Sequence, residues 1–89
     1  MDKAFKQALK RQAHHLKPVV IVGQSGFSDK VEGAISEALA SHELIKIKLP
    51  AVSPSERKQL AQALCSKLDA EIIQSIGRTV TIFKASDTV

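Results

Sequence analysis

Hydrophobic and polar positions recur along the chain at spacings that predict its elements. Residues 2–16 predict an amphipathic helix, because three apolar side chains fall within about 40° of one another on a helical wheel: Phe5, Leu9 and Leu16. Pro18 ends this helix, and residues 19–22 form a continuous β-branched run. Such a run predicts a strand that is covered on both faces.

A second helix and a second strand follow a short loop that contains glycine. Ser28 is a suitable N-cap, and apolar residues then recur at helical spacing, at Val31, Ala34, Ile35, Ala38 and Leu39. Within residues 44–49, apolar and polar positions alternate with a period of two. This alternation predicts a half-buried strand, with Ile45, Ile47 and Leu49 on one face and Lys46 and Lys48 on the other.

The third helix begins with a capping signal. Ser53 is placed to cap, Pro54 occupies the first helical position, and Glu56 stands three residues after the cap. We expect this helix to continue to about residue 68 and to bury its leucines, Leu60, Leu64 and Leu68. A hairpin should follow, since Gly77-Arg78 separates two strand-like segments, 70–76 and 79–83, with glycine first as a type II′ turn prefers.

These elements define the expected fold class. Their order is helix, strand, helix, strand, helix, strand, strand (α-β-α-β-α-β-β), and we predict an α/β fold of the two-layer α+β type. Four strands should form one mixed sheet, with three helices packed on it. We see no internal repeat and no linker, so residues 1–89 are expected to form a single domain.

Composition narrows the classes of function. The chain has 89 residues, of which 44% are hydrophobic and 25% charged, as in an ordinary globular protein. Only 3% are aromatic, so any nucleic-acid partner would be recognised by its shape and backbone rather than by several stacking rings. The single Cys65 is interpreted as a core or boundary residue, and no Cys/His pairs have zinc-ligand spacing. We therefore expect no metal and no cofactor.

The chain also lacks membrane and secretion signals. No apolar run approaches the roughly 20 residues of a membrane span, and the N-terminal stretch is charged rather than apolar. We expect a cytoplasmic protein with no membrane partner.

The distribution of charge singles out the N-terminal segment. Net charge is +4, and residues 27–89 carry eight side chains of each sign. The entire excess lies in residues 1–26, where Asp2 is the only acid against five basic side chains: Lys3, Lys6, Lys10, Arg11 and Lys17. On the first helix, Lys3, Lys6, Lys10, His14 and Lys17 cluster on one side, with no Glu at i+4 spacing to pair with them. A solvated face is the alternative interpretation of this ridge.

A Gly-x-x-Gly loop, residues 23–26, joins the first strand to the second helix. Backbone N–H groups near a helix N-terminus favour anions, and the missing side chains of Gly23 and Gly26 would let an RNA backbone approach closely. Gln24 and Ser25 can donate to phosphate or ribose. A tight turn needs glycine for local reasons too, but the cationic ridge lies only one short strand away. We therefore expect the loop and the ridge to form one continuous surface for ribose-phosphate.

Residues near the loop leave alternatives open. Phe27 could stack on a base, although packing beneath the turn is favoured. Adjacent histidines on a helix point about 100° apart, so His14 and His15 are not expected to form a catalytic or metal pair, and at least one of them is interpreted as a phosphate or ribose contact. Lys46 and Lys48 lie on one strand face and could extend the basic surface or be solvated.

Four segments together resemble the CRM domain, which is named for chloroplast RNA splicing and ribosome maturation. They are residues 9–20 (LKRQAHHLKPVV), 22–27 (VGQSGF), 42–46 (HELIK) and 74–78 (QSIGR). The resemblance covers nearly the whole chain in the right order and is strongest for the stand-alone bacterial YhbY type. Two positions differ, since Gln24 stands where the family often has Lys, and Phe27 where Leu is common.

The resemblance implies a fold similar to the C-terminal domain of bacterial translation initiation factor three. It also implies RNA binding by the Gly-x-x-Gly loop and adjacent basic residues, and association with ribosomal RNA in precursors of the large (50S) subunit during ribosome biogenesis. The expected RNA-binding residues are Lys6, Lys10, Arg11, His14, Lys17, Gly23, Gln24, Ser25, Gly26 and Lys46. The expected state is a monomer.

The sequence also bears on two other classes of function. A nucleotide-binding enzyme is disfavoured, because Phe27 and Ser28 stand where a P-loop has Lys and Ser/Thr, and no nucleophile-base set can be named. We expect neither catalysis nor a small-molecule substrate. The remaining alternative is a protein-interaction module that docks its basic helix on an acidic partner.

Overall fold

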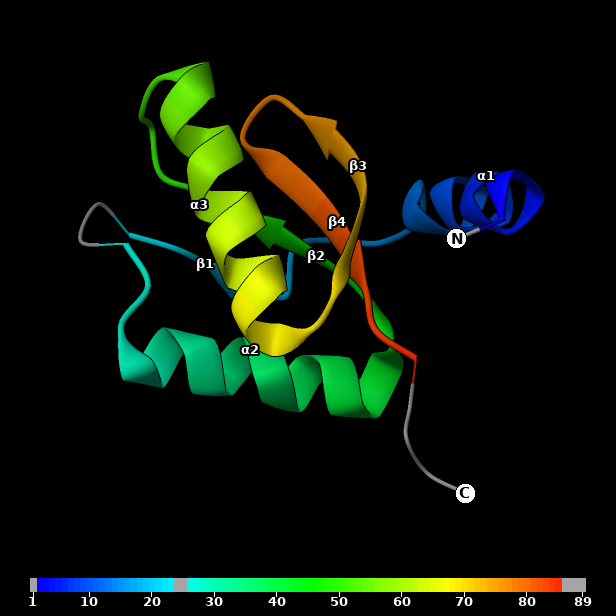
Figure 1. Cartoon of the computed structure of the whole chain (residues 1–89), viewed down its shortest axis with the longest axis horizontal. Helices are drawn as coiled ribbons and strands as arrows, with labels where there is room; N and C mark the ends of the chain where they lie inside the picture. Colours follow the sequence, from blue (N-terminus) through cyan, green and yellow to red (C-terminus); the bar gives the residue numbers. More distant parts are fainter. Residues whose placement is uncertain (1, 24–25, 86–89) are drawn as a thin grey trace.

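The elements of the computed structural model follow the predicted order, and the structure describes residues 2–23 and 26–85 (Figure 1). The fold has three helices and a four-stranded mixed sheet, as predicted. The helices are α1 (Lys3–Ala13), α2 (Asp29–His42) and α3 (Pro54–Leu68), and the strands are β1 (Val20–Ile21), β2 (Leu44–Lys48), β3 (Glu71–Ile76) and β4 (Thr79–Phe83).

The sheet has the strand order β1-β2-β4-β3. β1 pairs with β2 in parallel, because α2 carries the chain back between them, whereas β4 runs antiparallel to both of its neighbours. A register shift between Ile72 and Gln74 places a β-bulge at Ile73 in the edge strand β3. Gly77 adopts a positive φ of 56° in the β3–β4 turn, as the sequence predicts for that position.

The main core lies between the sheet and the helices α2 and α3. Ile45 and Ile47 of β2 face it, and their register partners Ile82 and Val80 lie beside them. The helices contribute Ile35 and Leu39 of α2 and Ala61, Leu64 and Cys65 of α3.

A smaller cluster joins α1 to the opposite face. Leu9 of α1 packs there with Leu44 of β2 and Ile73 of β3, and Phe83 lies against the same cluster. The ring of Phe5 meets that of Phe83 edge to face, with centroids 5.5 Å apart. The two faces of the sheet are therefore covered unequally, because α2 and α3 pack on one face and, in the described chain, only α1 packs on the other.

Helix boundaries follow local capping chemistry. The Oγ of Ser53 accepts from the N–H of Glu56 at 3.2 Å, and Ser28 caps α2 by accepting from Val31 at 3.3 Å. The first helix ends at Ala13 rather than at residue 16 as predicted. The N–H groups of residues 14–16 donate to carbonyls three residues earlier, in a tightened last turn that releases the chain before Pro18.

The predicted coverage of the first strand is wrong. Val19 and Ile21 are 54% and 69% exposed, whereas Val22 is 1% exposed and packs into the main core. The cause is position, since β1 is an edge strand and α1 does not extend over it. A β-branched run is compatible with one open face as well as with two covered ones.

Candidate nucleic-acid interface

The predicted cationic residues divide between α1 and the segment that follows it. Lys6 and Lys10 are half-buried along α1, and Arg11 and His14 are exposed at its C-terminal end. The sequence predicted Lys17 as part of the cationic ridge on the first helix. It lies beyond the end of that helix, so this placement is wrong. Positive side chains near a helix C-terminus interact favourably with its dipole.

Among the residues that the structure describes, the cations of this segment lie apart from the acids. Within residues 2–23 and 26–85, no carboxylate lies within ion-pair distance of Lys6, Lys10, Arg11 or Lys17. Elsewhere a lysine does find a partner, since the Nζ of Lys67 lies 3.0 Å from the carboxylate of Glu32. The N-terminal segment therefore presents positive charge that nothing in the described chain neutralises.

Lys46 is brought next to Lys17 by strand pairing. The N–H of Val19 donates to the carbonyl of Lys46 at 2.9 Å, which aligns the segment after α1 with β2. Both lysines line a hollow of about 450 Å³ together with His15 and His42. His42 was not predicted as a site residue, because it lies at the end of α2 and only the fold places it beside residues 15–17.

The glycine turn is tight and open to solvent. The N–H of Gly26 donates to the carbonyl of Gly23 at 3.0 Å, and Gly26 has a φ of +80°. A Cβ added to either glycine would meet nothing within 4 Å, so both present free backbone. Gln24 and Ser25, also predicted as contacts, lie outside the described residues. Phe27 packs against the main core, as favoured from the sequence over stacking on a base.

The turn and α1 are not adjacent, although the sequence suggested one continuous surface. The segment that contains β1 runs away from α1. Figure 1 shows α1 near one end of the long axis of the molecule and the end of this segment near the other, and the axis extends 34 Å. The segment 17–22 and the neighbouring strand β2 lie between the two sites. A ligand that touches both must therefore run along the sheet past Lys17 and Lys46.

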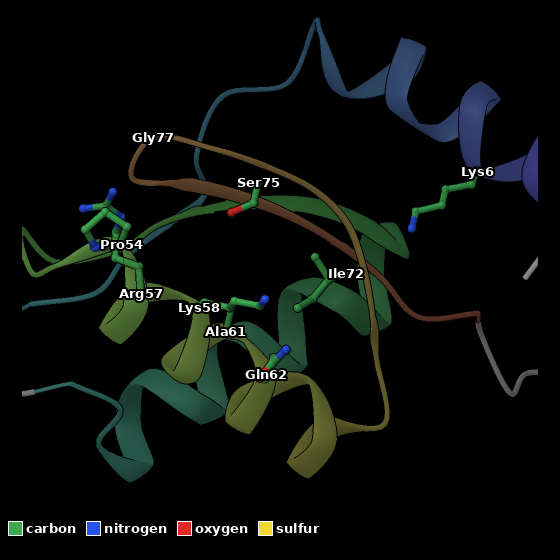
Figure 2. Close-up of a pocket in the computed structure, with 9 residues that line it drawn as sticks. All are labelled: Lys6, Pro54, Arg57, Lys58, Ala61, Gln62, Ile72, Ser75 and Gly77. Atoms are coloured by element: carbon green, nitrogen blue, oxygen red, sulfur yellow. The ribbon is translucent and has the colours of Figure 1, made fainter.

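A second group of cations surrounds a hollow of about 500 Å³ at the β3 edge of the sheet (Figure 2). Lys58 and Arg57 of α3 and Lys6 of α1 line it, and Ile72 lies between the helices. The Nη1 of Arg57 donates to the carbonyl of Val52 at 2.6 Å, which fixes this guanidinium. The sequence did not indicate Arg57 and Lys58 as site residues. They face the same hollow as Lys6 only because α1 and α3 pack on either side of it.

No catalytic or metal-binding group emerges from these surfaces. Burial, and to a smaller extent the nearby Glu71 carboxylate, raises the pKa of the Cys65 thiol to about 11. The thiol is therefore protonated at neutral pH and is a poor nucleophile. Within the described chain, no three His, Cys, Asp or Glu side chains gather as metal ligands would. In the same residues, no helix has both the length and the apolar character needed to cross a membrane.

The architecture and this surface define a small α+β domain with an unneutralised cationic face. The chain belongs to the CRS1 / YhbY (CRM) domain family, whose profile matches residues 1–84. Two similar proteins are "Probable RNA-binding protein PA4753" of Pseudomonas aeruginosa and "Probable RNA-binding protein YqeI" of Bacillus subtilis. The first is 37% identical over 89% of this chain and 76% of its own length, and the second is 35% identical over 91% and 84%.

A solved structure has the same fold. The solution structure of the hypothetical protein SAV1595 from Staphylococcus aureus superimposes with a TM-score of 0.86. The match covers 99% of this chain and 92% of SAV1595, at 26% sequence identity.

Proposed function

We propose that this chain is a non-enzymatic RNA-binding protein that holds the ribose-phosphate backbone. The observation that carries the proposal is the set of cations on α1 and residue 17, which no carboxylate of the described chain neutralises. Phosphate oxygens are the partners such cations attract, and backbone contacts supply much of the affinity for nucleic acid. The relatives named above as RNA-binding proteins support the same conclusion.

The proposed contacts are those expected from the sequence. Lys6, Lys10, Arg11, His14, Lys17 and Lys46 would bind phosphates, and the turn from Gly23 through Gln24 and Ser25 to Gly26 would receive another part of the strand. Because the long axis extends 34 Å, an RNA that reaches both ends would need roughly ten stacked nucleotides at about 3.4 Å each. Such a length favours a structured RNA over a mononucleotide.

Removing the cations should flatten the salt dependence of binding. About five phosphate contacts on single-stranded RNA give a log–log salt slope of about −3.5, and each neutralised contact removes roughly 0.7. The triple variant K10Q/R11Q/K17Q is therefore expected to reduce the slope by about two units. Fluorescence anisotropy between about 50 and 200 mM salt measures the slope. Over this range the unmodified chain is expected to lose RNA affinity by roughly a hundredfold.

The control is K67Q, which removes a cation from α3 on the other face of the sheet. Its slope should equal that of the unmodified chain. An unchanged slope in the triple variant would remove α1 from the interface. RNA binding that does not depend on salt, and that an excess of an acidic protein abolishes, would instead indicate a module that docks on proteins.

We further propose that the RNA is ribosomal RNA in precursors of the large subunit, bound by a cytoplasmic monomer. This proposal rests on the family's resemblance to ribosome-assembly factors. Ultraviolet crosslinking in cells, followed by sequencing of the attached RNA, should recover large-subunit RNA and its unprocessed ends above other abundant RNAs. Recovery of messenger or transfer RNA in proportion to its abundance would contradict it.

A further inference from the structure

The face of the sheet that α1 serves is covered only in part. α1 packs on one row of residues across the strands, formed by Leu44 and Phe83 with Ile73 of the bulge. Side chains alternate between faces along a strand, so positions two and four residues away from Leu44 and Phe83 point to the same side, and strand pairing extends these rows to β3 beyond its bulge. Those positions form two further rows, over which the described chain places no helix.

The register of the strands identifies the residues of these rows. Lys46 pairs with Thr81, which pairs with Gln74. In the outer row, Ile21 pairs with Lys48, Lys48 with Thr79, and Thr79 with Ile76. We call these two rows the open sheet face; Thr81, at the centre of the inner row, is only 3% exposed, so the accessible surface comes from the other six residues.

The open sheet face combines exposed aliphatic groups with lysines. Ile21 and Ile76 are 69% and 62% exposed at its two edges, and Lys48 lies in the same row. Its seven residues include no carboxylate. Single exposed aliphatic groups are common on protein surfaces, whereas a contiguous apolar patch marks a binding surface. Ile76 belongs to such a patch, because Leu16 and Pro18 line one hollow with it.

A hollow lies where the segment after α1 passes beside this face. It has a volume of about 250 Å³ and is lined by Lys17 and Lys46, by the apolar Leu16, Pro18 and Ile76, and by the polar Gln74 and Thr79. This volume is below the roughly 300–1,000 Å³ of sites that enclose a drug-sized molecule, so it suits a single flat group. A nucleobase has that shape, with apolar faces and a polar edge.

Unpaired RNA matches these features better than an acidic peptide does. Carboxylates could pair with the lysines, but they would leave Ile21 and Ile76 without apolar contacts. Splayed bases supply flat apolar surface, and the phosphates between them supply the negative charge. Duplex RNA cannot offer its bases in this way, because they are stacked inside the helix.

We infer that the open sheet face binds unpaired nucleotides, with bases against Ile76 and Ile21 and phosphates at Lys17 and Lys46. The inference rests on the proposed RNA-binding function and adds base contacts to it. Aliphatic side chains do here what aromatic rings do in other sheet-based RNA-binding domains. It also explains why a chain with 3% aromatic residues leaves large aliphatic groups exposed on a sheet.

The experiment compares two fluorescent oligoribonucleotides of equal length and charge, one with mixed unpaired bases and one abasic. The unmodified chain should bind the intact strand about tenfold more tightly, near the lower end of what base stacking contributes. In I21A/I76A this preference should vanish while the salt slope stays the same. Both side chains are mostly exposed, so the variant should fold, which circular dichroism checks.

Phe5→Ala is the matched control, since Phe5 is also exposed, at 46%, but lies on α1. It should keep the preference for the intact strand. Equal binding of both strands by the unmodified chain would overturn the inference and leave RNA binding in place, whereas binding of neither would contradict the proposed function itself. Binding of a polyglutamate peptide that is lost in I21A/I76A would also overturn it, by identifying a surface for proteins.

Discussion

Aspartate at both Gly23 and Gly26 is expected to lower RNA affinity by at least about a hundredfold, since like charges across an interface cost several kcal/mol. The turn is proposed to receive phosphate, and two carboxylates there would repel it. The fold should survive, because a Cβ at either position meets nothing within 4 Å. The positive φ of Gly26 adds a strain of roughly 1–2 kcal/mol, which Asp tolerates better than most residues. Fluorescence anisotropy at fixed salt measures the loss.

The control replaces both glycines with asparagine. Asn has the shape of Asp and tolerates the left-handed conformation at Gly26 equally well, but it carries no charge. The Asn pair therefore isolates the effect of filling the turn, and the Asp pair should bind at least about tenfold more weakly than it. A well-folded Asp pair that binds RNA tightly would show that the turn does not contact phosphate.

Ile47→Ala should destabilise the domain by about 2–5 kcal/mol, the usual cost of truncating a buried aliphatic side chain. Ile47 of β2 is fully buried in the main core, on the face of the sheet that α2 and α3 cover. Small domains are stable by only about 5–15 kcal/mol in total, so this single truncation removes a large share of the free energy of unfolding. Denaturation in urea, followed by circular dichroism, measures the change in the free energy of unfolding.

Ile21→Ala is the matched comparison, because it makes the same truncation in the strand that pairs with β2. Ile21 is 69% exposed, and its loss should change the free energy of unfolding by no more than about 0.5 kcal/mol. The contrast tests whether β1 has one open face. A cost for Ile21→Ala as large as that for Ile47→Ala would mean that both faces of β1 are covered, as the apolar run first suggested.

The sequence alone indicated several cations of the candidate interface, but it did not indicate how they are arranged. The absence of acids between Asp2 and Asp29 identified the cationic segment, and the turn at Gly23 and Gly26 was evident from its glycines. Their separation along the long axis was not, because spacing in the sequence does not give the direction in which β1 leads the chain. The same limit hid Arg57 and Lys58, which face Lys6 only once α1 and α3 are packed.

The sequence by itself determined the elements and their order, because these depend on interactions between near neighbours. The Oγ of Ser53 caps α3 through a contact three residues away, and Gly77 supplies the positive φ of its turn. The alternation of Ile45, Lys46 and Ile47 likewise assigned each side chain to a face. None of these features needs knowledge of distant parts of the chain.

Only the tertiary structure decided which surfaces remain open. Ile21 and Ile47 are the same residue type in paired strands, yet one is 69% exposed and the other 0%. The difference arises because α2 and α3 cover one whole face of the sheet, while α1 covers a single row of the other. Burial depends on what packs against a residue, and that contact is made by segments far away in the sequence.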